Sequence, residues 1–265
     1  MFYSKLVPVS PQTLGQSNWL RPTIFPLAVH HQFMPVCLSE LPRAAAHLPI
    51  IFLGQDEDIA PRLMMSLVPG ENHYFTPGGK CLEDYLPMVL RPYPFAKVRD
   101  SESGTDLLCI EEEYVVSPDT EDSIPIFTDE GQLTPHVTKI MQLIKLIEKE
   151  RLVLNRATKL LNKLGILADW PVKIKIGQDK QHEYTGLKRV GRTYLHKLSA
   201  EHLPALHECA GLELAFAQII SSNHFRRLNK WANIRRKKEM EENKMAGEIF
   251  GDADADFLLN WEQDE

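Results

Sequence analysis

The chain has 265 residues, 43% of them hydrophobic and 25% charged, and its formal net charge is −6. This composition is typical of a folded globular protein and excludes disordered, collagen-like and disulfide-scaffold classes. Because no apolar run is long enough to cross a bilayer and residues 1–13 do not resemble a secretory signal, we expect a cytoplasmic protein without membrane insertion.

The N-terminal part is rich in proline, which breaks helix interiors and so favours short strands there. Strands are predicted at Lys5–Val9, Pro49–Leu53, Leu63–Val68, His73–Thr76, Ala96–Arg99 and Leu107–Ile110. Two short helices are predicted near Glu40–Leu48 and Leu82–Leu90. Turn signals at Pro69-Gly70 and Gly78-Gly79 separate strands and indicate an antiparallel or mixed sheet.

A long helix follows an acidic connector, residues 111–133, which has one short strand predicted near Ile124–Phe127. Thr134 can cap this helix, Pro135 suits its first position and Gly165 ends it. Its apolar residues recur at steps of three or four or multiples of them: Val137, Ile140, Ile144, Ile147, Leu154, Leu161 and Leu164. We interpret this stripe as a face packed on the protein's own sheet rather than as an oligomer seam.

The remaining elements are shorter, apart from a last helix. Pro171–Ile176 alternates apolar residues with lysine, which predicts a half-buried strand, and Tyr184–Leu195 is predicted to add one or two strands. Ser199 can cap a helix that runs toward Cys209. The last helix is predicted from about Leu212 to beyond Trp231.

These elements predict an α+β fold with a mainly antiparallel or mixed sheet, a long central helix and a C-terminal helix. We assign residues 1–244 to one domain and residues 245–265 to an acidic mobile tail. The alternative division is a strand-rich subdomain, residues 1–130, and a helix-rich subdomain, residues 131–244.

Charge is segregated along the chain. Residues 111–130 carry eight acidic and no basic side chains, whereas residues 226–244 carry eight basic and three acidic ones. Residues 245–265 carry seven acidic and no basic side chains, so the other 244 residues have a net charge of +1. The acidity of the protein therefore comes from a connector and a tail attached to a slightly basic remainder.

The motifs of common catalytic and nucleotide sites are missing from the sequence: it has no P-loop, no strand-to-helix GxGxxG, no GxSxG elbow and no zinc-binding HExxH. Its four cysteines are far apart and its ten histidines include no pair four residues apart. We therefore expect neither a metal nor a cofactor.

Four polar residues are candidates for a noncontiguous catalytic site: Asn72, Arg91, Tyr93 and Glu111. Arg91 can hold a carboxylate with two hydrogen bonds, and Tyr93 and Glu111 can transfer protons. Turn formation and structural hydrogen bonding explain the same residues, and we favour that interpretation.

The C-terminal part contains a basic helical end followed by an acidic tail with bulky apolar residues. The negative net charge and the lack of a nucleic-acid-binding motif argue against nucleic acid as the partner of the basic end. Acidic residues mixed with apolar ones suit folding onto a basic, apolar groove of the same chain or of a partner. The residues predicted to bind a partner are Phe257, Leu258, Leu259, Trp261, Arg235 and Arg236.

Several local patterns resemble, in their order along residues 1–232, those of the bacterial SapC-like family. They are the opening MFYSKLVPVS, Tyr85-Leu86-Pro87 followed by RPYPF at 91–95, LCIEE at 108–112, PIFTDEG at 125–131 and GLELAFA at 211–217. Pro92 stands where the family has a second arginine, and the acidic tail lies beyond the family core.

The resemblance implies an association with bacterial surface layers, outer-membrane TonB-type receptors and flavoproteins that resemble tryptophan halogenases, but it implies no catalytic residue. We therefore expect an accessory or binding protein that recognises a peptide or protein partner in an envelope-related or uptake-related pathway. A flavoprotein is one candidate partner. The alternative is an enzyme that modifies a peptide or small metabolite.

Overall fold

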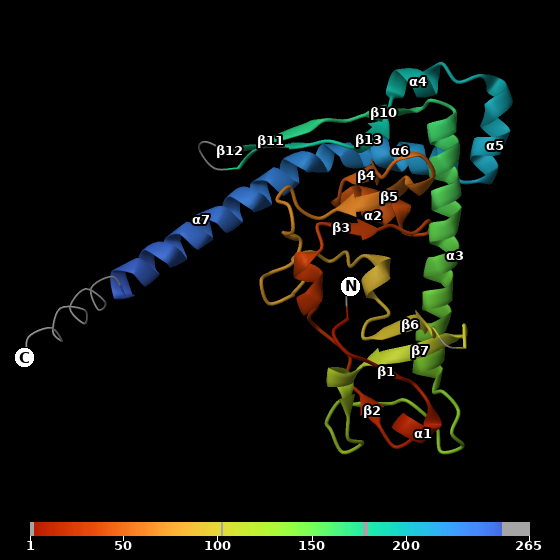
Figure 1. Cartoon of the computed structure of the whole chain (residues 1–265), viewed down its shortest axis with the longest axis vertical. Helices are drawn as coiled ribbons and strands as arrows, with labels where there is room; N and C mark the ends of the chain where they lie inside the picture. The colour runs from red at the N-terminus through yellow and green to blue at the C-terminus, as the bar shows by residue number, and fades with distance from the viewer. Residues whose placement is uncertain (1–2, 102, 177–179, 251–265) are drawn as a thin grey trace, which may run out of the picture.

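The computed structural model of the chain describes residues 3–101, 103–176 and 180–250. It contains 43% helix and 20% strand, and its described strand pairs are antiparallel. The predicted α+β class, with a long central helix and a C-terminal helix, is therefore confirmed (Figure 1).

A five-stranded sheet forms the larger part of the body, in the order β10-β13-β4-β5-β3. Its strands are β3 (Phe33–Pro35), β4 (Ile50–Leu53), β5 (Ala60–Met64), β10 (Leu167–Asp169) and β13 (Leu187–Val190). Ile50, Ile51 and Phe52 of the central strand are all fully buried. Because successive residues of a strand point to opposite faces, both faces of β4 are covered by other elements.

Helix α6 (Gly211–Ser221) is fastened to this sheet by polar as well as apolar contacts. It packs against α2 (Leu41–His47), β4 and β13. The buried Gln218 side chain donates to the carbonyl oxygen of Ile50 at 3.3 Å and accepts from the backbone nitrogen of Val190 at 3.0 Å. The hydroxyl oxygen of Ser221 accepts from the backbone nitrogen of Ile50 at 2.9 Å. These bonds fix which face of α6 meets the sheet.

The smaller part of the body holds two three-stranded sheets and the short helix α1 (Pro11–Leu14). One sheet has the order β1 (Leu6–Pro8), β7 (Asp106–Glu111) and β6 (Phe95–Arg99), and the other has the order β8 (Val115–Val116), β2 (Asn18–Trp19) and β9 (Ile124–Pro125). They share a second core in which Trp19 and Phe95 meet edge to face, with their ring centres 5.0 Å apart.

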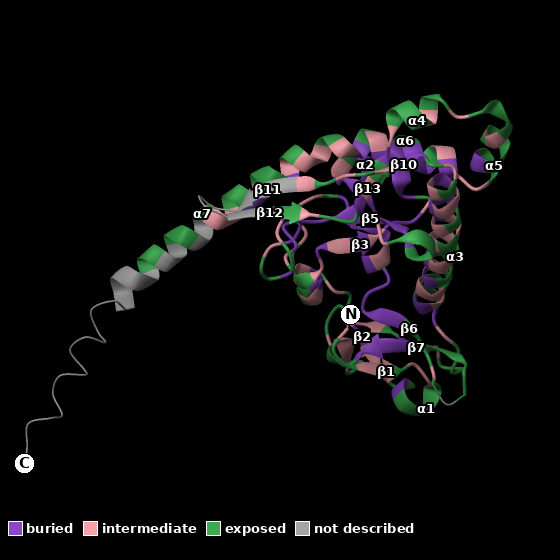
Figure 2. Cartoon of the chain, turned by 45° about the horizontal axis from the view of Figure 1, so that its top comes forward, coloured by how far each residue is buried: buried purple, intermediate pink, exposed green. Residues whose placement is uncertain are grey.

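Helix α3 (Pro135–Lys163) runs along both parts of the body (Figures 1 and 2). Val137 and Ile144 enter the smaller core, whereas Leu154 and Leu161 enter the larger one. The apolar stripe therefore packs on the protein's own sheets, as we interpreted it. Thr134 occupies the N-cap position, but its hydroxyl donates to the carbonyl oxygen of Pro125 at 3.0 Å and does not cap the helix.

The C-terminal third begins with the hairpin β11 (Val172–Ile176) and β12 (Lys180–Tyr184), and continues through α4 (Arg192–His196) and α5 (Leu203–Glu208) to α6. The predicted last helix is interrupted after α6 by a 3₁₀ turn, Ser222–His224, and resumes as α7 (Phe225–Phe250). The hydroxyls of Ser221 and Ser222 donate to carbonyl oxygens three residues earlier, which competes with the helical pattern at this point. Helix α7 projects from the body (Figures 1 and 2).

Four predicted elements are wrong or misplaced. The strand predicted at Leu63–Val68 lies earlier in the chain, at Ala60–Met64. Leu82–Leu90 is not a helix but a loop that ends in a 3₁₀ turn at Met88–Leu90, since Pro87 disfavours a helical conformation for the residue before it. The strand predicted over His73–Thr76 is reduced to a single bridge between Phe75 and Cys81. After Val190 the chain turns at Gly191 and forms α4, where we expected a strand to continue.

Candidate functional site

Asn72 and Glu111, two of the predicted catalytic candidates, are buried and satisfied by structural hydrogen bonds. The Asn72 amide donates to the carbonyl oxygen of Ala28 at 2.9 Å, and its oxygen accepts from the backbone nitrogen of Tyr74 at 3.0 Å. The Glu111 carboxylate accepts from the backbone nitrogens of Ser4 and Lys5 and from the Ser4 hydroxyl, over 2.6–3.0 Å. Glu111 therefore holds the N-terminal segment against β7.

Arg91 and Tyr93, the other two candidates, lie in different environments. Arg91 is exposed, and its Nε donates to the carbonyl oxygen of Leu86 at 3.1 Å. Tyr93 is buried; its hydroxyl lies 3.3 Å from the Glu113 carboxylate, and burial raises its pKa. Tyr93 lines a small hollow with Phe25, Leu27, Ala28 and Leu90, which does not include the other three candidates.

The predicted partner-binding residues lie in the C-terminal part. Arg235 donates to the carbonyl oxygen of Phe75 at 3.4 Å and so lies where α7 contacts the body, whereas Arg236 donates to the Asn233 side chain of the same helix at 3.2 Å. Phe257, Leu258, Leu259 and Trp261 lie outside the described residues.

Sequence reasoning did not find a hydrogen-bonded set formed by Ser66, Glu71 and His73. The Ser66 hydroxyl oxygen lies 3.2 Å from His73 Nδ1, and His73 Nε2 lies 2.5 Å from a Glu71 carboxylate oxygen. If Nε2 carries the proton that Glu71 accepts, Nδ1 is left to accept the proton of Ser66. This is the order of groups in a serine–histidine–carboxylate triad, although Ser66 is fully buried and its oxygen accepts from the backbone nitrogen of Val68 at 2.9 Å.

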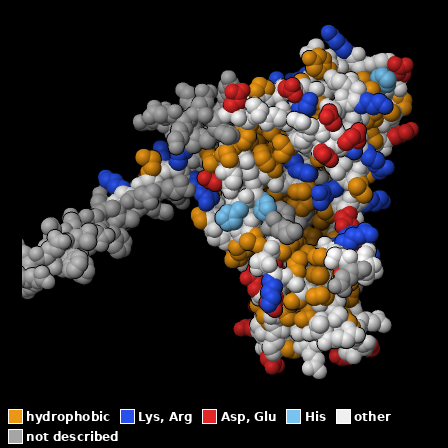
Figure 3. Space-filling model, in the orientation of Figure 1, with side chains coloured by type: hydrophobic (Ala, Val, Ile, Leu, Met, Phe, Trp, Pro, Cys, Tyr) orange, Lys and Arg blue, Asp and Glu red, His pale blue; other side chains and the backbone are white. Residues whose placement is uncertain are grey.

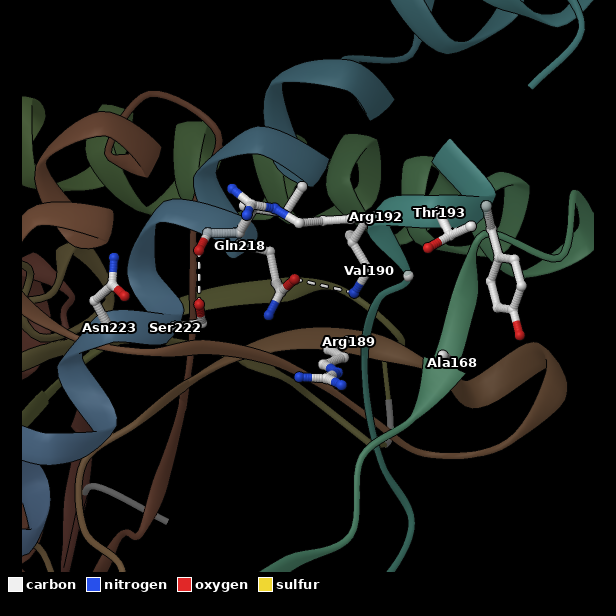
Figure 4. Close-up of a pocket in the computed structure, with 11 residues that line it drawn as sticks. Ala168, Arg189, Val190, Arg192, Thr193, Gln218, Ser222 and Asn223 are labelled. Carbon is white, nitrogen blue, oxygen red and sulfur yellow. Dashed lines mark hydrogen bonds between the residues drawn. The ribbon is translucent and has the colours of Figure 1, made fainter. Parts of the chain in front are cut away.

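A second feature that the sequence did not reveal is a polar hollow of about 720 Å³ between α6, β13 and the start of α4. Its wall includes Arg189, Arg192, Thr193, Ser222 and Asn223. Figure 4 shows the Arg192 side chain extending toward α6 above the hydrogen bond from Val190 to Gln218, and the Arg189 side chain below this bond. The Gln218 side chain, held by hydrogen bonds to Ile50 and Val190, thus lies between the two arginines.

An apolar hollow of about 570 Å³ adjoins the polar one, because both are lined by Arg192 and Ile219. Its other lining residues are Leu195, His196, Leu203, Leu212 and Phe216. Phe216 is 55% exposed, and Ile220, one helical turn further along α6, is 59% exposed. We call the two hollows together the α6 groove. It is apolar at one end and cationic at the other.

The two arginines of the α6 groove lack carboxylate partners among residues 3–101, 103–176 and 180–250. The Arg189 guanidinium lies over the Trp170 ring, 5.2 Å from its centre. Arg189 and Arg192 are both exposed. Because guanidinium groups pair with carboxylates through two parallel hydrogen bonds, the cationic end suits an anionic group.

In the part of the chain that the structure describes, no group of three or more His, Cys, Asp or Glu side chains is placed to hold a metal ion. The described helices also include none that is long and apolar enough to span a membrane.

Comparisons with known proteins give one finding. The family model of SapC matches residues 13–228, which is most of the chain and includes the α6 groove. Searches of curated proteins and of solved structures returned no match.

Proposed function

The chain belongs to the SapC family, and we propose that it is a binding protein that recognises an acidic, partly apolar peptide segment of a protein partner in the α6 groove. The observation that carries this proposal is the location of Arg189 and Arg192, which pair with no carboxylate of the described residues, beside an exposed apolar hollow. A peptide that carries a carboxylate and a bulky apolar side chain would fill both the cationic and the apolar end of the α6 groove.

The shape and anchoring of α6 support peptide recognition. Phe216 and Ile220 lie one turn apart on the exposed face, while Gln218 and Ser221 hold the opposite face to the sheet. A rigid helix with an unpaired apolar face can accept an amphipathic segment without reorganising its own backbone. The envelope-related or uptake-related pathway and a flavoprotein partner remain proposals that rest on the family alone.

Fluorescence polarisation tests the groove directly. The probe is a labelled synthetic peptide that combines aspartates with phenylalanine and leucine, and the protein is the full chain. We expect the double variant Arg189→Glu, Arg192→Glu to weaken binding by about tenfold or more, because two charge-assisted hydrogen bonds are lost and two repulsions are introduced. Phe216→Ser is expected to weaken binding at the apolar end.

The matched control is Lys145→Glu, Lys149→Glu, which makes the same change of charge on the exposed face of α3. It should leave the affinity close to that of the unaltered chain once salt screens long-range attraction. Equal affinities of the groove variant and this control would overturn the proposal.

A second candidate function, acyl transfer or hydrolysis, is favoured by the Ser66, Glu71 and His73 set. In this reaction His73 Nδ1 would take the Ser66 proton as the serine oxygen adds to an ester or amide carbonyl, and Glu71 would stabilise the imidazolium. The imidazolium would then give its proton to the leaving alcohol or amine as its bond to the carbonyl carbon breaks, and water or another nucleophile would release the acyl group from Ser66. A fluorophosphonate probe tests it: covalent labelling that is lost in Ser66→Ala and kept in Ser222→Ala supports catalysis. The unaltered chain remaining unlabelled assigns the set to structure.

A further inference from the structure

Helix α7 carries a strong separation of charge that the groove alone does not explain. Residues 226–238 include seven basic and no acidic side chains, whereas residues 239–250 of the same helix include four acidic and one basic, and residues 251–265 add six acidic ones. Figure 3 shows Lys and Arg side chains on the part of α7 nearest the body. The second half of the helix presents Met240 and Met245, which are 70% and 61% exposed.

The length of α7 keeps the tail away from the groove of its own chain. Its 26 residues rise about 39 Å, and they begin immediately after Ser222 and Asn223, which line the groove. Phe257 follows the helix by seven residues, and a fully extended chain of that length spans about 25 Å. While α7 is helical, Phe257 therefore cannot return to its own groove.

The same length suits a second copy. If two α7 helices lie antiparallel, the basic half of each faces the acidic half of the other, so that opposite charges meet along both helices. This arrangement also brings the end of each helix to the start of the other, which is where the α6 groove opens. The tail that arrives there contains Asp256, Phe257, Leu258 and Trp261, which have the mixed acidic and apolar character that the groove fits.

We propose that two copies of this chain exchange their C-terminal arms, residues 225–265, with antiparallel α7 helices and the tail of each copy in the α6 groove of the other. This inference rests on the proposed function, since it uses the same groove, and it names the partner segment. Each contact occurs twice under a two-fold axis, so the assembly closes as a dimer. The arm beyond Leu228 lies outside the residues matched by the family model, so the exchange belongs to this chain's C-terminal extension.

Light scattering after size exclusion tests the exchange with the full chain. We expect a dimer whose dissociation constant rises with salt, because facing charges hold the arms together. Two variants should each shift the chain toward monomer: Phe257→Ser with Trp261→Ser in the tail, and Arg189→Glu with Arg192→Glu in the groove. Lys145→Glu with Lys149→Glu should remain dimeric.

Mixing provides the sharper test. The tail variant keeps an intact groove and the groove variant keeps an intact tail, so a mixture of the two should recover a heterodimer with one exchanged arm. Photo-crosslinking from position 260 in a mixture of unlabelled and ¹⁵N-labelled chains should join α4 or α6 of one isotope to the tail of the other.

The outcomes separate this inference from the proposed function. A chain that stays monomeric, or cross-links only within one isotope, overturns arm exchange, and binding of the external peptide then still supports the groove. A dimer that both double variants leave unchanged overturns arm exchange as well. If the external peptide also fails to bind, the proposed function falls with it.

Discussion

Glu111 in β7 and the arginine pair of the α6 groove are both charged, but the fold surrounds them differently. The Glu111 side chain is 1% exposed and accepts hydrogen bonds from three donor groups of Ser4 and Lys5. Arg189 and Arg192 are exposed, and among the described residues no carboxylate pairs with them. A buried charge that is fully paired contributes to the fold, whereas an exposed charge without a partner is available to a ligand.

Replacing Glu111 should give the largest effect on stability. We expect Glu111→Ala to lower the free energy of unfolding by about 3 kcal/mol, because it removes the hydrogen bonds that a buried carboxylate accepts from three donor groups of Ser4 and Lys5, and bonds to charged groups are the stronger kind. Urea unfolding measures this loss. Glu112→Ala is the neighbouring control: Glu112 pairs with Lys5 at the surface, and its loss should cost less than about 1 kcal/mol. Equal losses for the two variants would contradict the assignment of Glu111 as a structural clamp.

Glu40 is a second buried carboxylate that accepts several hydrogen bonds, and it tests the same argument. Its carboxylate accepts from the backbone nitrogens of Cys37 and Met88 and from the Tyr85 hydroxyl, over 2.7–2.9 Å, and burial raises its pKa. Glu40→Ala should lower the free energy of unfolding by about 2 kcal/mol, since three buried donors lose their acceptor. Adding Tyr85→Phe to Glu40→Ala should recover little of this loss, because the backbone nitrogens of Cys37 and Met88 stay without their acceptor. A stability unchanged in urea would show that water replaces the carboxylate.

The groove arginines should give the opposite result in the same measurement. Arg192→Glu is expected to change the free energy of unfolding by less than about 0.5 kcal/mol, because the side chain is exposed and forms no ion pair within the described part of the chain. Arg189→Glu should cost about 0.5–1 kcal/mol, since it removes the contact with the Trp170 ring. A loss as large as that of Glu111→Ala would show that these arginines stabilise the fold, and it would weaken the proposed function.

The smallest expected effect concerns pH and the junction between α6 and α7. Burial lowers the pKa of His224, whose Nε2 lies 3.1 Å from the carbonyl oxygen of Ala45. A lowered pKa means that the folded state binds this proton more weakly than the unfolded chain does. The stability from this group is therefore present above pH 6.5, the ordinary value, and is lost as pH falls through the lowered pKa.

We expect the unaltered chain to lose more stability than His224→Asn between about pH 7 and about pH 5, because asparagine can donate to Ala45 but does not titrate there. Thermal unfolding in matched buffers compares the two. If both chains lose the same stability as pH falls, His224 does not cause the pH dependence of stability.

Much of the larger architecture could be predicted from local patterns. The apolar repeat between Val137 and Leu161 specified α3, and the proline-rich beginning specified short antiparallel strands. Predictions failed where a tertiary contact overrode the local signal. Leu82–Leu90 forms a loop in which Pro87 disfavours a helix and the Tyr85 hydroxyl bonds to Glu40, 45 residues away. The last helix is interrupted between α6 and α7, where the hydroxyls of Ser221 and Ser222 bond to the preceding turn.

The candidate site followed the same division. The sequence by itself determined the segregation of charge, the family and the helix that follows Leu212, because each depends on composition or on short-range spacing. Only the tertiary structure placed Arg189 and Arg192 beside Phe216, and Ser66 beside His73, because those contacts depend on how β13, α4 and α6 meet and on how one loop folds back. The tertiary structure also showed that the side chains of Asn72 and Glu111 are hydrogen-bonded to backbone groups. The spacing of residues cannot reveal this, because a buried polar side chain finds its hydrogen-bond partners only when distant segments of the chain come together.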